Sequence, residues 1–146
     1  MNLSWFRFKS ETNSNNMSDS KGHRGLIVYQ KSFELAMQIF RETIQFPKEE
    51  KFSLIDQMRR SSRAVCSAIA EAYRKRMYEA YFVNKLTDAD SENSETLVWL
   101  EFAESCSYMT TTKRNELEKL NLEIGRMLNS MIENPEKFLI KKKEKN

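Results

Sequence analysis

The residues in this sequence best suited to chemistry are six cations that flank a small-residue, apolar stretch in "QMRRSSRAVCSAIAEAYRKR", residues 57–76. Guanidinium and ammonium groups bind phosphate oxygens, and such binding is largely indifferent to base sequence. The sequence therefore predicts a surface that binds the backbone of RNA or DNA. The predicted binding residues are Arg59, Arg60, Arg63, Arg74, Lys75 and Arg76.

An alternative explanation of these cations is ion pairing with the acids that follow them. Residues 50–76 carry seven cations against three anions, whereas residues 77–105 carry one cation against seven anions. The arginines could therefore pair with these acids, within a subunit or across an oligomer interface. The candidate partners are Asp88, Asp90, Glu92, Glu95 and Glu101.

Part of the charge is also expected to be satisfied locally, because Glu71 precedes Lys75 by four residues and Asp56 precedes Arg60 by four. The remaining cations near residue 75 favour a helix C-terminus by only about 0.3 to 1 kcal/mol each. A basic tail follows at the end of the chain, and nearby aromatic side chains could stack bases or pack in a core. The tail cations are Lys141, Lys142, Lys143 and Lys145, and the aromatic residues are Tyr73, Tyr78 and Tyr81.

Residues for catalysis or metal binding are sparse. The single histidine, His23, lies in a polar segment, and Cys66 and Cys106 have no Cys or His at metal-ligand spacing. The sequence contains no Glu-x-x-His pair of a carboxylate-bridged metal bundle and no Gly-rich phosphate loop. We therefore expect no enzyme activity, no metal and no cofactor.

The elements that position the cations are predicted to be four helices. The 146 residues suit one domain, and three Gly and two Pro are too few for a β-sandwich. Apolar residues recur at helical spacing over about 26–46, 51–76, 78–106 and 113–134, with short connections between them. Short connections favour antiparallel neighbours, so the sequence predicts an all-α, antiparallel up-down-up-down four-helix bundle over residues 26–136.

Specific residues are expected in the core of this bundle. Asn93 lies within the third stripe, where a polar residue typically fixes register or oligomer state. The acids of "PKEE" suit the N-terminus of the second helix. The first stripe is Phe33, Ala36, Met37, Phe40 and Ile44, and the second begins with Phe52, Ile55 and Met58.

The two ends of the chain are predicted to lie outside the bundle. Residues 1–25 form a polar leader without a helical period, which we expect to be disordered, and residues 137–146 form a basic tail. No stretch reaches the roughly 18 apolar residues that a membrane span needs, and the first residues lack the apolar run of a secretory signal. A cytoplasmic protein with no membrane partner is expected.

Several motifs together resemble a known family. They are "LIVYQKSFELA", "FPKEE", "QMRRSS" with "AIAEAYRKR", "FVNKL", "SETLVWLEFA" and "MLNSMIENPEKF". They resemble the bacterial four-helix bundle proteins that include those encoded by intervening sequences in 23S ribosomal RNA genes, over about residues 26–138. The resemblance implies a ring-shaped homo-oligomer, with a pentamer favoured, and RNA or DNA contact. It also implies a relation in fold to the accessory subunit that partners a reverse transcriptase in diversity-generating retroelements, and it brings no catalytic residues.

The chain departs from this family within the second helix. Where similar proteins read Asn-Ile-Ala-Glu-Gly, this sequence reads "AIAEA", residues 68–72. Alanine favours a helix over glycine by about 1 kcal/mol, so the second helix should be extended and stiffened here. The combined prediction is a non-catalytic, oligomeric nucleic-acid-binding adaptor; the alternative is a structural bundle whose basic residues close subunit interfaces.

Overall fold

The computed structural model describes residues 19–142, and within this range every regular element is a helix. Short 3-10 segments accompany four long α-helices. In chain order the elements are η2 (Asp19–Gly25), α1 (Ile27–Thr43), η3 (Lys48–Glu50), α2 (Leu54–Arg74), α3 (Glu79–Ser105), α4 (Thr111–Glu133) and η4 (Pro135–Lys137). The predicted all-α class and the four helices are confirmed.

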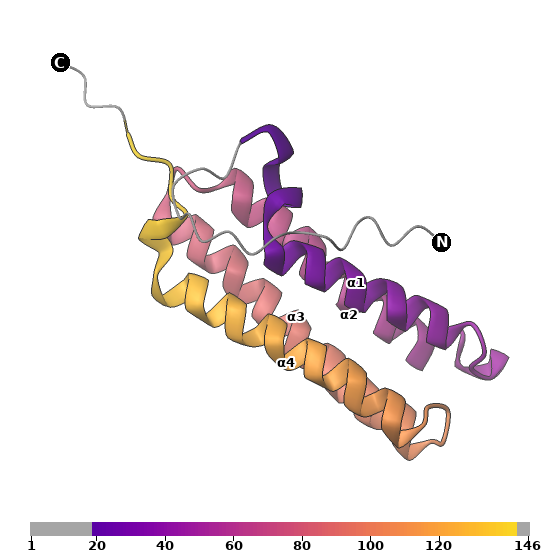
Figure 1. Cartoon of the computed structure of the whole chain (residues 1–146). Coiled ribbons are helices and arrows are strands. Elements are labelled where there is room, and N and C mark those ends of the chain that lie inside the picture. The colour runs from indigo at the N-terminus through magenta and orange to yellow at the C-terminus, as the bar shows by residue number, and fades with distance from the viewer. Residues whose placement is uncertain (1–18, 143–146) are drawn as a thin grey trace.

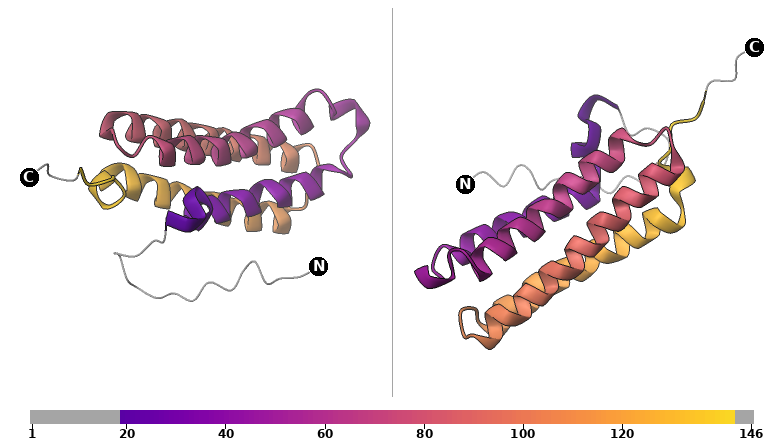
Figure 2. Two further views of the ribbon diagram at one scale, coloured as in Figure 1. Left: turned by 90° about the horizontal axis from the view of Figure 1, so that it is seen from above. Right: turned by 180° about the vertical axis from the view of Figure 1, so that it is seen from behind.

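The four helices form an antiparallel bundle in which consecutive helices are neighbours and α4 also packs against α1 (Figures 1 and 2). The α1–α2 and α3–α4 connections lie at one end. The α2–α3 connection lies at the other end, together with η2 and the C-terminal segment (Figure 1). This up-down-up-down arrangement follows from the short connections. No helix among residues 19–142 is long and apolar enough to cross a membrane.

The predicted stripe of helix α1 is only partly in the core: Ala36 is buried as predicted, but the centre of the buried face is shifted. Phe33 and Ile44 are 52% and 65% exposed, whereas Leu35 and Ile39 are buried. The buried face also includes Ser32 and Thr43, whose hydroxyls donate to the carbonyls of residues 28 and 39 at 2.6 and 2.8 Å. These intrahelical bonds satisfy the hydroxyl groups, so the residues can be buried. Helix α1 therefore carries apolar residues on two faces, and the predicted stripe lies between them, with Ala36 in the core and Phe33 and Ile44 outside.

Helix α2 begins later than its predicted apolar stripe. Phe52 is 87% exposed, and the buried stripe starts at Leu54 and Ile55. The N-terminus is capped by Glu50, whose carboxylate accepts from the Leu54 backbone N–H at 3.1 Å and from the Tyr108 hydroxyl at 3.1 Å. Hydrogen bonds from Ser53 and Leu54 lower the pKa of Glu50. The helix continues unbroken through Ala72, which is fully buried, as the alanines at residues 68–72 predict.

A buried amide pair joins α3 to α4. Asn93 and Asn121 each donate to the other's backbone carbonyl, at 2.9 and 2.8 Å, and Asn121 also donates to the Asn93 side chain at 3.0 Å. A one-residue shift would leave buried amides without partners, so the pair fixes the register of these two helices. This agrees with the register role predicted for Asn93.

Both ends of the described chain pack on the bundle. Segment η2 contacts α1 and α2, and the His23 ring meets the Tyr29 ring edge to face at 4.7 Å. Disorder of the leader is therefore wrong for the described part, Asp19–Gly25; residues 1–18 lie outside the described range. At the other end Phe138 stacks on Phe82 at 6.3 Å, so the first residues of the predicted tail belong to the folded unit.

Candidate nucleic-acid interface

The six predicted binding residues divide into two groups along α2. Arg59 and Arg63 lie on the side of α2 that faces α1. Arg60 lies in the same N-terminal half of the helix, next to Arg59 in sequence. Arg74, Lys75 and Arg76 lie at the C-terminal end of α2, near the α2–α3 connection (Figure 1). The structure therefore does not join all six into one site.

Arg59 and Arg63 pack on an aromatic ring of α1. The Arg59 guanidinium lies 4.8 Å from the centre of the Phe40 ring, and its Nε donates to the Thr43 hydroxyl at 3.0 Å. The Arg63 guanidinium lies 6.0 Å from the same ring. Neither arginine has an ion pair with a carboxylate of residues 19–142. They are cations on an aromatic surface along the side of the bundle.

Arg60 has a weak local partner. Its guanidinium lies 3.7 Å from the Asp56 carboxylate, and the Arg60 side chain is 74% exposed. This confirms the predicted local pairing of Asp56 with Arg60. An exposed pair of this kind stabilises a helix by only about 0.3 to 0.5 kcal/mol, so most of the Arg60 charge remains available.

The predicted pairing of the α2 arginines with acids of α3 is wrong within the subunit, for the part of the chain that the structure describes. Lys85 of α3 forms the ion pairs at this seam instead. Its ammonium lies 2.8 Å from Glu71 of α2 and 3.5 Å from Asp88 of α3. Glu71 therefore pairs across to α3, and the predicted Glu71–Lys75 pair does not form. The hydrogen bond and the opposite charges act on both groups: Glu71 raises the pKa of Lys85, and Lys85 lowers the pKa of Glu71.

The cations at the end of α2 lie beside aromatic rings. The Lys75 ammonium is 5.3 Å from the centre of the Tyr81 ring. Arg76 stacks on Tyr73 at 3.6 Å and donates to the Tyr73 carbonyl at 2.8 Å. Arg74 is exposed and has no ion pair with any carboxylate described. The side chains of Lys75 and Arg76 therefore pack on the rings of Tyr81 and Tyr73.

Backbone contacts bring further cations to this end of the bundle. The Ile140 N–H donates to the Arg76 carbonyl at 3.2 Å, which places the start of the basic tail beside α2. Segment η2 reaches the same end, and the Gln30 side chain donates to the Arg24 carbonyl at 2.8 Å (Figure 1). We call this surface the basic end and define it by Arg24, Arg74, Lys75, Arg76, Lys137, Lys141 and Lys142.

Carboxylates are fewer at the basic end than cations. The acids in the same segments are Asp19 in η2, Glu79 at the start of α3, Glu133 at the end of α4 and Glu136 in η4. Glu79, Glu133 and Glu136 form no ion pair with a residue of the described range. Among the residues that the structure describes, the cations of the basic end therefore outnumber the acids of the same segments.

Arg24 and Lys137 were missed by sequence reasoning because they lie far from residues 74–76 in the chain. A signal was nonetheless present. In an up-down-up-down bundle the start of helix 1, the end of helix 2, the start of helix 3 and the end of helix 4 share one end. Counting the charges of those four positions together would have found both residues.

Two exposed tyrosines border the basic end. Tyr78 and Tyr81 are 57% and 58% exposed, and their rings meet edge to face at 5.9 Å. Tyr73 is buried beneath Arg76, so of the two predicted roles it has the one of packing in the core. Tyr78 and Tyr81 are the exposed tyrosines near these cations in the described range, and bases can stack on exposed rings.

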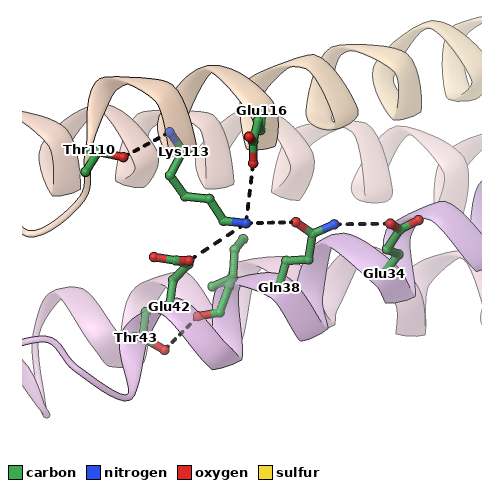
Figure 3. Close-up of polar contacts among 8 residues, drawn as sticks. Glu34, Gln38, Glu42, Thr43, Thr110, Lys113 and Glu116 are labelled. Carbon is green, nitrogen blue, oxygen red and sulfur yellow. Dashed lines mark hydrogen bonds and ion pairs between the residues drawn. The ribbon is translucent and has the colours of Figure 1, made fainter. Parts of the chain in front are cut away.

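Some cations elsewhere on the bundle are neutralised at the seams between helices. Between α1 and α4, the Lys113 ammonium lies 3.5 Å from Glu116 and 3.8 Å from Glu42, and it donates to Gln38 at 3.4 Å (Figure 3). Between α3 and α4, Arg114 lies 2.8 Å from Glu104. The lack of ion pairs at Arg59, Arg63 and Arg74 is thus a property of particular surfaces and does not hold for every cation.

A metal site is not assembled in the described part of the chain, which contains no cluster of three His, Cys, Asp or Glu residues able to hold an ion. Burial raises the pKa of the Cys66 thiol to about 12, so this thiol is protonated and unreactive at neutral pH. Cys106 is exposed. The arrangement offers binding chemistry through cations and aromatic rings.

Comparison with known proteins gives a family. Residues 24–130 match the family model described as 23S rRNA-intervening sequence protein. No curated protein matches the chain in sequence. A crystal structure of a protein of unknown function from the S23 ribosomal protein family of Bacteroides thetaiotaomicron VPI-5482 is similar, with 30% identity and a TM-score of 0.66. The similarity covers 73% of this chain and 96% of that one. The chain belongs to the 23S rRNA-intervening sequence protein family.

Proposed function

We propose that this protein is a non-catalytic, oligomeric adaptor that binds the phosphate backbone of RNA or DNA through its basic end. The observation that carries the proposal is the convergence of cations from η2, α2, η4 and the C-terminal segment on one end. Phosphate is the natural counterion for such a surface, and repetition around an oligomer would strengthen its potential. Exposed Tyr78 and Tyr81 add ring faces for unpaired bases.

The family supplies a first ligand to test, because its name associates these proteins with intervening sequences of 23S rRNA. We propose structured RNA as the ligand and the cytoplasm as the place of action. A homo-oligomer, with a pentamer favoured, and a reverse transcriptase as protein partner are proposed on the family resemblance.

The test is fluorescence polarisation with a labelled RNA hairpin at two salt concentrations. We expect the affinity to fall by about 10³-fold between about 50 and about 200 mM salt, if roughly six phosphates are contacted. The variant Arg74→Glu, Lys75→Glu should lose binding. Arg76 is left unchanged because it stacks on Tyr73.

The matched control reverses two exposed charges of α4, Lys119→Glu and Arg126→Glu, which lie within the bundle's length and away from its end. This control changes the net charge by the same amount, so it should keep most of the affinity if the position of the charge matters. No binding at low salt, or equal losses in the two variants, would refute the proposal.

A second function, a structural bundle that acts through contacts between subunits, is favoured for Arg59 and Arg63. These two residues lie along the side of the bundle beside exposed apolar residues of α1, away from the basic end. Both functions can reside in one molecule, because they use different surfaces.

A further inference from the structure

A shallow hollow lined by aromatic rings lies between the start of α2 and the end of α3. Phe52 and Phe102 are 87% and 52% exposed there, and the half-buried Trp99 ring lies 5.9 Å from the Phe102 ring. Exposed rings gathered at one place are typical of a docking surface, because covering them removes apolar area from water. We call this surface the aromatic hollow and define it by Glu50, Phe52, Gln57, Trp99, Phe102 and Cys106.

Carboxylates stand at the edges of the aromatic hollow. Glu50 lines it, and the Glu95 carboxylate accepts a hydrogen bond from the Trp99 ring N–H at 3.3 Å. Neither glutamate forms an ion pair with a cation among residues 19–142. The Lys51 ammonium lies 5.3 Å from the centre of the Phe52 ring, so an aromatic ring at this edge already carries a cation. The hollow therefore suits a ligand that combines aromatic rings with positive charge.

The sequence supplies a segment of this composition outside the described residues. Residues 5–9 read "WFRFK", in which three aromatic residues are interleaved with Arg7 and Lys9. The family model matches residues 24–130 and does not cover this segment. Its rings complement the rings of the aromatic hollow, and its two cations complement the two carboxylates.

The described end of the leader lies close enough for this segment to reach the hollow. A Cβ atom at Gly22 would lie 3.9 Å from the Tyr73 ring, so η2 lies beside the last turn of α2. Gln57 of the hollow precedes Tyr73 by sixteen residues on α2, which is about 24 Å at the rise of an α-helix. Residues 9–18 span up to roughly 33 Å when extended. The leader is therefore long enough to bring residues 5–9 to the hollow of its own chain.

We infer that residues 5–9 dock in the aromatic hollow of the same chain. In this arrangement the rings of the segment cover the exposed rings of the hollow, and Arg7 and Lys9 lie near its carboxylates. The leader then crosses the side of the bundle from the basic end to the opposite end. The inference goes beyond the proposed function, because it concerns a surface distant from the basic end and involves no nucleic acid.

The test uses the exposed thiol of Cys106, which lines the hollow. The variant Ser4→Cys introduces a second thiol next to the docked segment, while the buried Cys66 thiol stays unreactive. Oxidation with diamide should join the introduced thiol to Cys106 within one chain. Peptide mass spectrometry identifies this disulfide, and a non-reducing gel shows whether it joins one chain or two.

The matched control adds Trp5→Ser, Phe6→Ser and Phe8→Ser to the Ser4→Cys variant. It keeps the same thiols and the same reach but removes the rings, so the disulfide should form at least about 10-fold more slowly, because docking no longer raises the local concentration of the thiol. Adding Arg7→Glu and Lys9→Glu instead should also slow it.

None of these substitutions alters a residue of the described bundle, and circular dichroism checks that the helices are unchanged. Equal rates with and without the three rings, a disulfide that joins two copies, or no disulfide would overturn the inference. Loss of RNA binding by Arg74→Glu, Lys75→Glu would leave it unaffected, because those residues lie at the other end of the bundle.

Discussion

Two isoleucines of α1 occupy opposite environments only five residues apart. Ile39 is fully buried in the core, whereas Ile44 is 65% exposed on the outside of the bundle. Replacing each by alanine removes the same atoms from the same helix. The two substitutions therefore separate the contribution of the core from that of the outer face.

We expect Ile39→Ala to lower the free energy of unfolding by about 2 to 5 kcal/mol, because it leaves a cavity. Ile44→Ala should change it by no more than about 0.5 kcal/mol in the monomer. Urea denaturation at low protein concentration measures both. Equal effects would mean that the core face of α1 has been assigned wrongly.

Two glutamates provide a matched pair for pH dependence. The raised pKa of Glu92 means that the folded state binds its proton more tightly than the unfolded state does. The stability that Glu92 contributes is present at acid pH and is lost as the pH rises through its raised pKa. Glu71 has a lowered pKa because of Lys85, so its contribution is present at neutral pH and lost as pH falls through the lowered value.

We therefore expect Glu92→Gln to stabilise the monomer at neutral pH and Glu71→Gln to destabilise it. Below both pKa values the two glutamates are protonated, and each variant should approach the unchanged protein. Thermal unfolding at neutral and acid pH, at low protein concentration, shows whether each variant is more or less stable than the unchanged protein. Changes of the same sign at neutral pH would contradict this account of the charges.

At the scale of elements, α3 and α4 are held in register by the Asn93–Asn121 pair. Replacing Asn121 by alanine leaves the buried amide of Asn93 without its partners, which typically costs about 1 to 3 kcal/mol beyond the lost packing. Because the two residues share their hydrogen bonds, the effects of Asn93→Ala and Asn121→Ala should not add.

A double-mutant cycle of these two residues, followed by urea denaturation, should give a coupling energy of about 0.5 to 3 kcal/mol. The double variant should thus be less destabilised than the sum of the single variants. An additive result would show that the pair does not act as a unit.

The number of helices and two of their boundaries could be predicted from the sequence because proline marks them locally. The connection at Pro47 and the stop at Pro135 appear in the structure where the sequence predicts them. The core face of α1 could not be predicted from apolar period alone. Ser32 and Thr43 are polar by type but are buried through bonds to their own helix, while Phe33 and Ile44 are left outside.

The absence of ion pairs between the α2 arginines and the α3 acids within the described residues also could not be predicted from a helical wheel. A wheel gives the direction of a side chain on its own helix, but pairing depends on the distance to the next helix. Lys85 reaches Glu71 across the α2–α3 seam, whereas Arg59 and Arg63 point toward α1 and its Phe40 ring.

At the scale of the whole molecule, topology separates two kinds of surface. The ends of four segments meet at the basic end, whereas Arg59 and Arg63 lie along the side of the bundle against Phe40. The six residues predicted to form one site therefore lie on two separate surfaces.

The central claim is that Arg74 and Lys75 contact backbone phosphates. The most direct measurement is the dependence of RNA affinity on salt for the unchanged protein and for Arg74→Gln, Lys75→Gln. If each side chain contacts one phosphate, the slope of log affinity against log salt should fall in magnitude by about 2. The matched variant Lys119→Gln, Arg126→Gln should keep the slope of the unchanged protein. A slope that does not change when Arg74 and Lys75 are neutralised would contradict the claim.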